Sequence, residues 1–155
     1  MQRLLCRRIC SSPPPRVYPA FITVSSRWND NDAFGHVNNA VYYSYVDTAV
    51  NSHLIANGVT GNRFLAQSSC RYIRPLAYPQ DVDIGLSITK LGTSSATYAL
   101  GIFSRPAASI EGPPRSTARE LCAEATYTHV YVDDVGRPMA MLDHTRRVLE
   151  KLMND

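Results

Sequence analysis

The chain has 155 residues, of which 45% are hydrophobic and 19% are charged, and its formal net charge is +3 at pH 7. This length and apolar content suffice for one folded domain with a single core, and they exclude a highly charged disordered chain. The small positive excess attracts anionic ligands, but it falls short of the basic surface of nucleic-acid-binding proteins, so we expect no nucleic-acid partner.

The cysteines and histidines show no spacing typical of zinc ligands, so no metal site is expected. Cys6 and Cys10 lie in a basic leader, whereas Cys70 and Cys122 lie in predicted strands. A disulfide framework is therefore not expected, and a reducing interior compartment is favoured. No apolar run reaches the ~18 residues of a membrane-spanning helix, so we expect no membrane partner.

Residues 1–19 form a proline-containing leader with four arginines and no acidic residue. Such a composition is typical of a disordered basic tail and also of a mitochondrial transit peptide. Arginines interrupt its apolar pieces, which disfavours a secretory signal. We expect a folded domain over residues 20–155. Its location is predicted to be cytoplasmic, or mitochondrial if the leader is a transit peptide.

The first predicted element is a strand over residues 21–28. Ile22, Val24 and Trp28 alternate with polar residues, and this period of two indicates a half-buried strand. The polar segment that follows, residues 29–39, is rich in Asn, Asp and Gly. It can end a strand and cap a helix.

A helix is predicted from Asn39 to Asn57, followed by Gly58, which suits the C′ position of a helix end. Its apolar residues wrap most of the circumference, which predicts burial on most sides. Asp47 and Asn51 are the main polar interruptions.

Four further strands are predicted over residues 64–74, 81–90, 95–104 and 120–132. A loop rich in Pro, Gly and Ser separates the last two strands, over residues 105–119. Apolar residues at helical spacing then predict a short amphipathic helix within residues 139–153.

This order of elements predicts an α+β fold in which one long sheet curls around the central helix. Because no helix separates the later four strands, we expect them to form an antiparallel meander. The outer edges of the sheet would then be open, which favours pairing with a second copy of the chain.

The segment between the first strand and the central helix carries the clearest chemical pattern. Asp30 and Asp32 lie just before a helix N-terminus, where unpaired N–H groups and the helix dipole can polarise a carbonyl. A carboxylate about one turn upstream can act on the same carbonyl, directly or through water.

Three other interpretations of this segment compete with a catalytic one. A calcium loop is excluded, because Phe34 occupies an oxygen-ligand position and Val41 replaces the bidentate glutamate. Local chemistry alone leaves two possibilities open. The two aspartates could serve only to cap a turn, or His36 could pair with a carboxylate as a general base.

The run Asp-Asn-Asp-Ala-Phe-Gly-His-Val-Asn-Asn-Ala-Val-Tyr-Tyr, residues 30–43, resembles the signature of the hotdog thioesterases related to 4-hydroxybenzoyl-CoA thioesterase. The predicted order of elements is similar to that family's fold over residues 20–150. The resemblance implies a hotdog fold, with a five-stranded antiparallel sheet curled around a long central helix and a short C-terminal helix. It also implies hydrolysis of a small or medium acyl-CoA, with no cofactor beyond the CoA of the substrate.

The resemblance also assigns roles to individual residues. It makes Asp32 the catalytic nucleophile or general base and gives the backbone N–H of Asn39 the task of polarising the thioester carbonyl. Asp47, on the central helix, ranks well behind Asp32. The resemblance further implies that sites form at the interface of a homodimer, which can pair into a homotetramer. The substrate-binding residues it implies are Gly35, His36, Asn38 and Tyr42.

CoA phosphates require cationic partners, and no spacing selects among the candidates, which are Arg71, Arg74, Lys90, Arg105, Arg115 and Arg137. Two alternatives to a thioesterase remain open. One is a non-catalytic protein that binds acyl-CoA or an acyl carrier protein, which the presence of Asp32 disfavours. The other is a hotdog hydratase or dehydratase, whose usual pairing of a histidine with an acid is not evident here.

Overall fold

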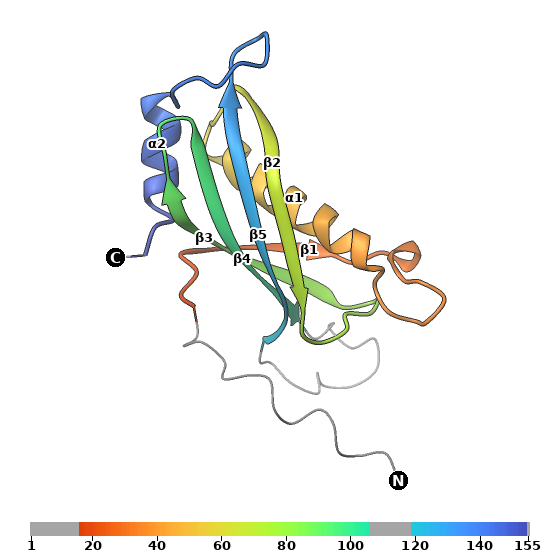
Figure 1. Ribbon diagram of the computed structural model, residues 1–155. Helices are drawn as coiled ribbons and strands as arrows, with labels where there is room; N and C mark the ends of the chain where they lie inside the picture. The colour runs from red at the N-terminus through yellow and green to blue at the C-terminus, as the bar shows by residue number, and fades with distance from the viewer. Residues whose placement is uncertain (1–15, 106–118, 155) are drawn as a thin grey trace.

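The computed structural model describes residues 16–105 and 119–154, and its elements follow the predicted order (Figure 1). The strands are β1 (Ala20–Ser25), β2 (Asn62–Tyr72), β3 (Asp81–Leu91), β4 (Ser95–Arg105) and β5 (Glu120–Val132). The helices are the short 3₁₀ helix η1 (Trp28–Asp30), the long helix α1 (Asn39–Ala56) and the C-terminal helix α2 (Asp143–Glu150).

All five strands form one antiparallel sheet in the order β1-β3-β4-β5-β2. The predicted meander is therefore confirmed for β3, β4 and β5 but is wrong for β2. The reason is that β1 already pairs with β3, with Ala20 opposite Leu86. The place beside β3 is thus filled, and β2 lies at the far edge beside β5.

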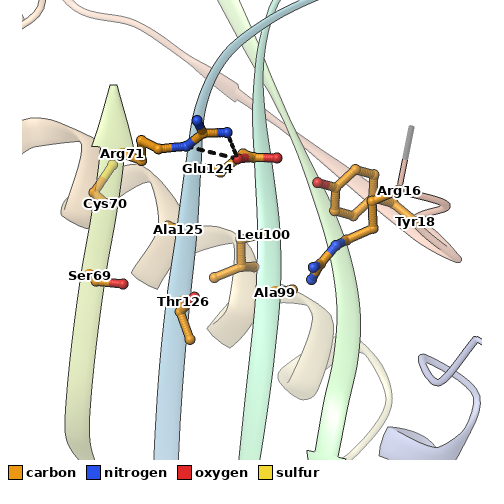
Figure 2. Close-up of a pocket in the computed structure, with 10 residues that line it drawn as sticks. All are labelled: Arg16, Tyr18, Ser69, Cys70, Arg71, Ala99, Leu100, Glu124, Ala125 and Thr126. Atoms are coloured by element: carbon orange, nitrogen blue, oxygen red, sulfur yellow. Dashed lines mark hydrogen bonds and ion pairs between the residues drawn. The ribbon is translucent and has the colours of Figure 1, made fainter. Parts of the chain in front are cut away.

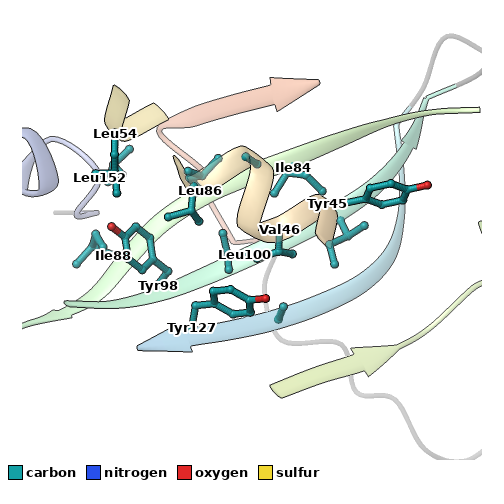
Figure 3. Close-up of a cluster of buried hydrophobic side chains, with 14 of the residues drawn as sticks. Tyr45, Val46, Leu54, Ile84, Leu86, Ile88, Tyr98, Leu100, Tyr127 and Leu152 are labelled. Carbon is teal, nitrogen blue, oxygen red and sulfur yellow. The ribbon is translucent and has the colours of Figure 1, made fainter. Parts of the chain in front are cut away.

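The core lies between the concave face of the sheet and α1 (Figure 3). Alternation along β3 places Ile84, Leu86 and Ile88 on this face, opposite apolar residues of β4. Val46 and Leu54 of α1 pack into the same cluster. The period of two seen in the sequence is therefore the pattern of core residues in the sheet.

In the single chain, helix α1 is buried along one side only. The prediction that it is buried on most sides is therefore wrong for the single chain. Its buried residues include Tyr45 and Val50, while Asp47 is exposed and Ile55 is 71% exposed. The helix packs on β1 and β3, and side chains of β5 and β2 also reach it, since the Tyr127 hydroxyl donates to the Tyr43 carbonyl and the Tyr72 hydroxyl to the Asn39 carbonyl. Its C-terminus is as predicted, with Gly58 in the left-handed region at φ 67°.

Several predicted boundaries change, and two of the changes affect how residues are placed. Strand β1 ends at Ser25, so Trp28 does not lie on the buried side of a strand but in η1, where it is 80% exposed. The chain turns here because the Arg27 backbone N–H binds the side chain of Asp30. Helix α2 is shorter than the predicted segment, and Met141 is buried just before it.

The outer face of the sheet carries a clamp made by the two ends of the described chain. Gly85 and Gly101 are cross-strand partners, and the ring of Tyr18 lies directly over both. A Cβ atom at Gly85 would lie 2.6 Å from this ring. From the other end, the Asn154 side-chain amide donates to the Val17 carbonyl at 2.9 Å.

The curled five-stranded sheet, its long helix and the short C-terminal helix are the hotdog fold that the resemblance implies, and this prediction is confirmed. Most of the leader, with Cys6 and Cys10, and the loop residues 106–118 lie outside the described residues. Predictions about them therefore stay predictions. No helix in the described part of the chain is long and apolar enough to span a membrane.

Candidate active site

Asp30 anchors the loop that precedes α1. Its side chain is only 1% exposed and accepts hydrogen bonds from the Arg27 backbone at 2.7 Å and the Tyr45 hydroxyl at 2.6 Å. Burial alone would raise the pKa of this carboxyl. The bonds from Tyr45 and Arg27 outweigh burial and hold the pKa below its usual value. Asp30 is therefore a structural carboxylate that ties the loop to α1.

Asp32 shapes a tight turn with one of its carboxylate oxygens. Oδ1 accepts the N–H of Phe34 at 2.8 Å and, more weakly, that of His36 at 3.4 Å. The turn needs Gly35 in the left-handed region, at φ 78°. Oδ2 has no hydrogen bond among the described residues. Asp32 thus caps a turn and still keeps one oxygen for chemistry.

The first turn of α1 leaves one donor open. The Asn38 side chain caps the helix by accepting the Ala40 N–H at 2.9 Å, and the Asn38 N–H donates to the Asp30 carbonyl at 2.9 Å. No hydrogen bond in residues 16–105 or 119–154 uses the N–H of Asn39, as expected for the first residue of a helix.

A cleft of about 400 Å³ brings most of the predicted site residues together. Four of them line it, namely Asp32, His36, Asn39 and Tyr42. Gly35 and Asn38 do not line it and instead shape the turn and cap the helix. The remaining lining residues are Phe34, Val37, Tyr72, Ile73, Arg74 and Pro75.

The second wall of the cleft, Tyr72 to Pro75, was not predicted as part of the site apart from Arg74. The Tyr72 hydroxyl donates to the Asn39 carbonyl at 2.9 Å, and its ring meets that of Tyr42 edge to face at 5.0 Å. Burial raises the pKa of both phenols, so both keep their protons at neutral pH. Only the sheet topology could reveal Tyr72, because 33 residues separate it from Asn39.

Asp47 does not line the cleft. It is exposed on α1, eight residues or about 12 Å of helix beyond Asn39. The position of Asp47 outside the cleft agrees with its lower rank. The assignment of the catalytic role to Asp32 stays a prediction.

Of the basic residues proposed for the CoA phosphates, Arg74 lines the cleft, with Glu120 at 3.5 Å. Arg105 lies 3.9 Å from Asp83, and Lys90 and Arg137 are exposed elsewhere. Arg71 pairs with Glu124 in a different cavity of about 310 Å³, on the outer face of the sheet (Figure 2). Arg115 lies outside the described residues.

A metal centre is not evident in the part of the chain that the structure describes, where no group of three or more His, Cys, Asp or Glu side chains could hold an ion. Among the described residues, the cleft brings the Asp32 carboxylate and the open N–H of Asn39 together. The His36 ring, the Arg74 guanidinium and the phenols of Tyr42 and Tyr72 line it beside them.

Comparison with known proteins places this geometry in context. A family model described as the thioesterase superfamily matches residues 34–110. The PA5185 protein of Pseudomonas aeruginosa is 36% identical, with a TM-score of 0.78 over 89% of this chain and 94% of that one. No curated protein sequence matches the chain significantly.

Two more distant structures share the fold. A thioesterase of Thermus thermophilus, solved with coenzyme A and zinc, is 23% identical, with a TM-score of 0.68 over 87% of this chain and 95% of that one. A mutant 4-hydroxybenzoyl-CoA thioesterase bound to 4-hydroxybenzoyl-CoA is 12% identical, with a TM-score of 0.71 over 84% of this chain and 97% of that one.

Proposed function

This chain belongs to the thioesterase superfamily, and we propose that it hydrolyses the thioester of a small or medium acyl-CoA to the free acid and CoA. The observation that carries the proposal is the meeting of Asp32 and the open N–H of Asn39 in one cleft.

In the proposed reaction the thioester carbonyl oxygen accepts the Asn39 N–H. The positive end of the α1 dipole stabilises the charge that develops on this oxygen. Asp32 then acts in one of two ways. As a nucleophile, its carboxylate bonds to the acyl carbon while the C–S bond breaks and the CoA thiolate departs. The product of this step is a mixed anhydride, which water then hydrolyses. As a general base, it takes a proton from a water molecule, whose oxygen bonds to the acyl carbon as the C–S bond breaks and the CoA thiolate departs.

The other residues of the cleft position the substrate in this proposal. Tyr42 and Tyr72 form the wall against which the acyl group or the pantetheine arm packs, and His36 lines the opposite loop. Arg74 is the cation best placed for a CoA phosphate, because it is the one candidate of the described set that lines the cleft.

We also propose a homodimer as the working unit. Strand β2 is the edge of the sheet, and in the described chain its outer side has no partner, while Phe64 and Leu65 on it are 59% and 44% exposed. Helix α1 lies next to β2, since the Tyr72 hydroxyl donates to the Asn39 carbonyl, and its exposed residues include Asp47 and Ile55. Pairing of two β2 edges would cover both surfaces.

The proposal is tested by free-thiol release from a panel of short, long and aromatic acyl-CoAs. Replacing Asp32 with Ala should lower kcat by roughly 10²- to 10⁴-fold while the protein stays folded. Asp47→Ala is the matched control, and its kcat should stay close to that of the wild type. Detection of an acyl group on Asp32 by mass spectrometry would identify the nucleophilic route.

Two results would count against the proposal. Full activity in Asp32→Ala would mean that another group carries the reaction. A wild-type protein that binds acyl-CoA but releases no thiol from any substrate would favour the non-catalytic binding role.

A further inference from the structure

An exposed pair of aromatic rings lies at the far ends of the two loops that wall the cleft. Trp28 is 80% exposed and Tyr78 is 39% exposed, and their rings meet edge to face at 5.9 Å and 83°. An edge-to-face contact with one neighbour covers at most one face of an indole. At least one face of Trp28 is therefore open to solvent.

Hydrogen bonds hold the two loops that carry the pair together. The Tyr78 N–H donates to the Asn31 side chain at 3.1 Å, and the Ser26 hydroxyl donates to the Gln80 carbonyl at 2.5 Å. These bonds join the two loops on either side of the rings, and the buried Asp30 fixes the turn that carries Trp28. A planar ligand that stacks here would lose little free energy to ordering of the protein.

The pair is also close to the proposed reaction centre. Trp28 lies four positions before Asp32, so their Cα atoms lie within about 14 Å of each other by chain length alone. On the other loop, Tyr78 follows Arg74, which lines the cleft, by four residues. Both walls of the cleft thus lead to the same two rings.

We infer that Trp28 and Tyr78 form a stacking platform for the adenine ring of the CoA substrate. This inference rests on the proposed function. CoA carries a thioester at one end and a purine at the other, joined by a flexible arm and a diphosphate. With the thioester beside Asp32 and a phosphate on Arg74, the purine reaches the rim, where the open indole face offers the planar apolar surface that a base prefers.

Kinetics with two substrates test the platform. Stacking of a base on an aromatic side chain corresponds to roughly 5- to 100-fold in affinity. Trp28→Ala should therefore raise KM for an acyl-CoA by about this factor and leave kcat unchanged. For the matching acyl-pantetheine thioester, which lacks the nucleotide, both constants should stay at their wild-type values. Trp28→Phe keeps an aromatic face and should keep most of the affinity for the acyl-CoA.

A second measurement does not depend on turnover. Trp28 is the single tryptophan of the chain, so its fluorescence reports on this site alone. Titration with CoA and with adenosine 3′,5′-bisphosphate should change the emission saturably, and pantetheine should not. Tyr78→Ala should weaken the nucleotide response in the same direction.

The outcomes separate the two proposals. A saturable nucleotide response in a protein that hydrolyses no thioester would leave the platform standing and defeat the thioesterase proposal. An active enzyme with no nucleotide response, or with equal KM changes for both substrates in Trp28→Ala, would overturn the platform. Circular dichroism of each variant checks that it remains folded.

Discussion

Asp30 and Asp32 are two positions apart and have opposite surroundings. The first is buried and holds bonds from Tyr45 and Arg27, whereas the second is half-buried and uses one oxygen for a turn. Because the pKa of Asp30 is lowered in the folded protein, its ionised form stabilises the fold. That contribution is complete above the unfolded pKa of about 4 and is lost as the pH falls further.

Tyr45→Phe should isolate the structural role of Asp30. The variant leaves a buried carboxylate without its hydroxyl donor, which should cost about 1–3 kcal/mol of unfolding free energy. Urea denaturation at pH 7 measures this loss. Tyr43→Phe is the matched control, since no described hydrogen bond uses the Tyr43 hydroxyl, and its stability should change little.

His129 provides a prediction about pH. It is 3% exposed on the inner face of β5, and its Nδ1 has no partner among the described residues. Burial, aided by nearby Arg63 and opposed by Asp47, lowers the pKa of His129 to about 4. The unfolded chain therefore binds more protons than the folded one between pH 6.5 and 4, and stability falls as the pH drops through this window.

His129→Phe should remove much of that slope. A shift of this size corresponds to roughly 3 kcal/mol between the two ends of the window. Urea denaturation at pH 4.5 and pH 7 of both proteins provides the comparison. An equally steep loss of stability in the variant would show that other groups cause it.

Among the strands and helices, the sequence predicts those features that the residues within a single element decide. Alternation in residues 81–90 and the helix from Asn39 were confirmed, because the side chains of one element decide them. The place of β2 depends on which edge β1 occupies, and no pattern within β2 encodes this. For the same reason the motif predicted one wall of the cleft and missed Tyr72 on the other. The sequence pattern placed Trp28 on the buried side of a strand, because the alternation of apolar residues continues to Trp28. The strand itself ends at Ser25, before the turn that Asp30 stabilises.

The clamp of Tyr18 over β3 and β4 gives a prediction at this level. Gly85→Ala would bring a methyl group against the ring, so we expect a loss of about 1–3 kcal/mol in unfolding free energy. In a Tyr18→Ala background the same change should cost much less, because the ring it strikes is gone. Guanidinium denaturation of the four proteins in this cycle measures the coupling. Equal costs in both backgrounds would contradict the clamp.

For the whole molecule, the proposed dimer would cover the open edge of β2 and the exposed side of α1. In the proposed dimer, Leu65→Lys would place a charge in the interface, so the measured mass should fall from twice the chain mass of 17.2 kDa toward the single value. Light scattering coupled to gel filtration measures it. Val135→Lys, at a position 74% exposed in the turn after β5, is the matched control. A dimer that survives Leu65→Lys unchanged would place the interface elsewhere.

The division of labour between Asp30 and Asp32 has a consequence for evolution. Loss of the first removes a buried anchor of the fold, whereas loss of the second removes the turn bonds to Phe34 and His36 and leaves that anchor and the core in place. Under the proposed function, selection for folding acts mainly on the first position and selection for catalysis mainly on the second. A lineage could then become a pseudoenzyme through a single change at Asp32 and still inherit the fold. In related sequences, an aspartate at the first position without one at the second would then mark a pseudoenzyme, and aspartate at both would mark an active enzyme.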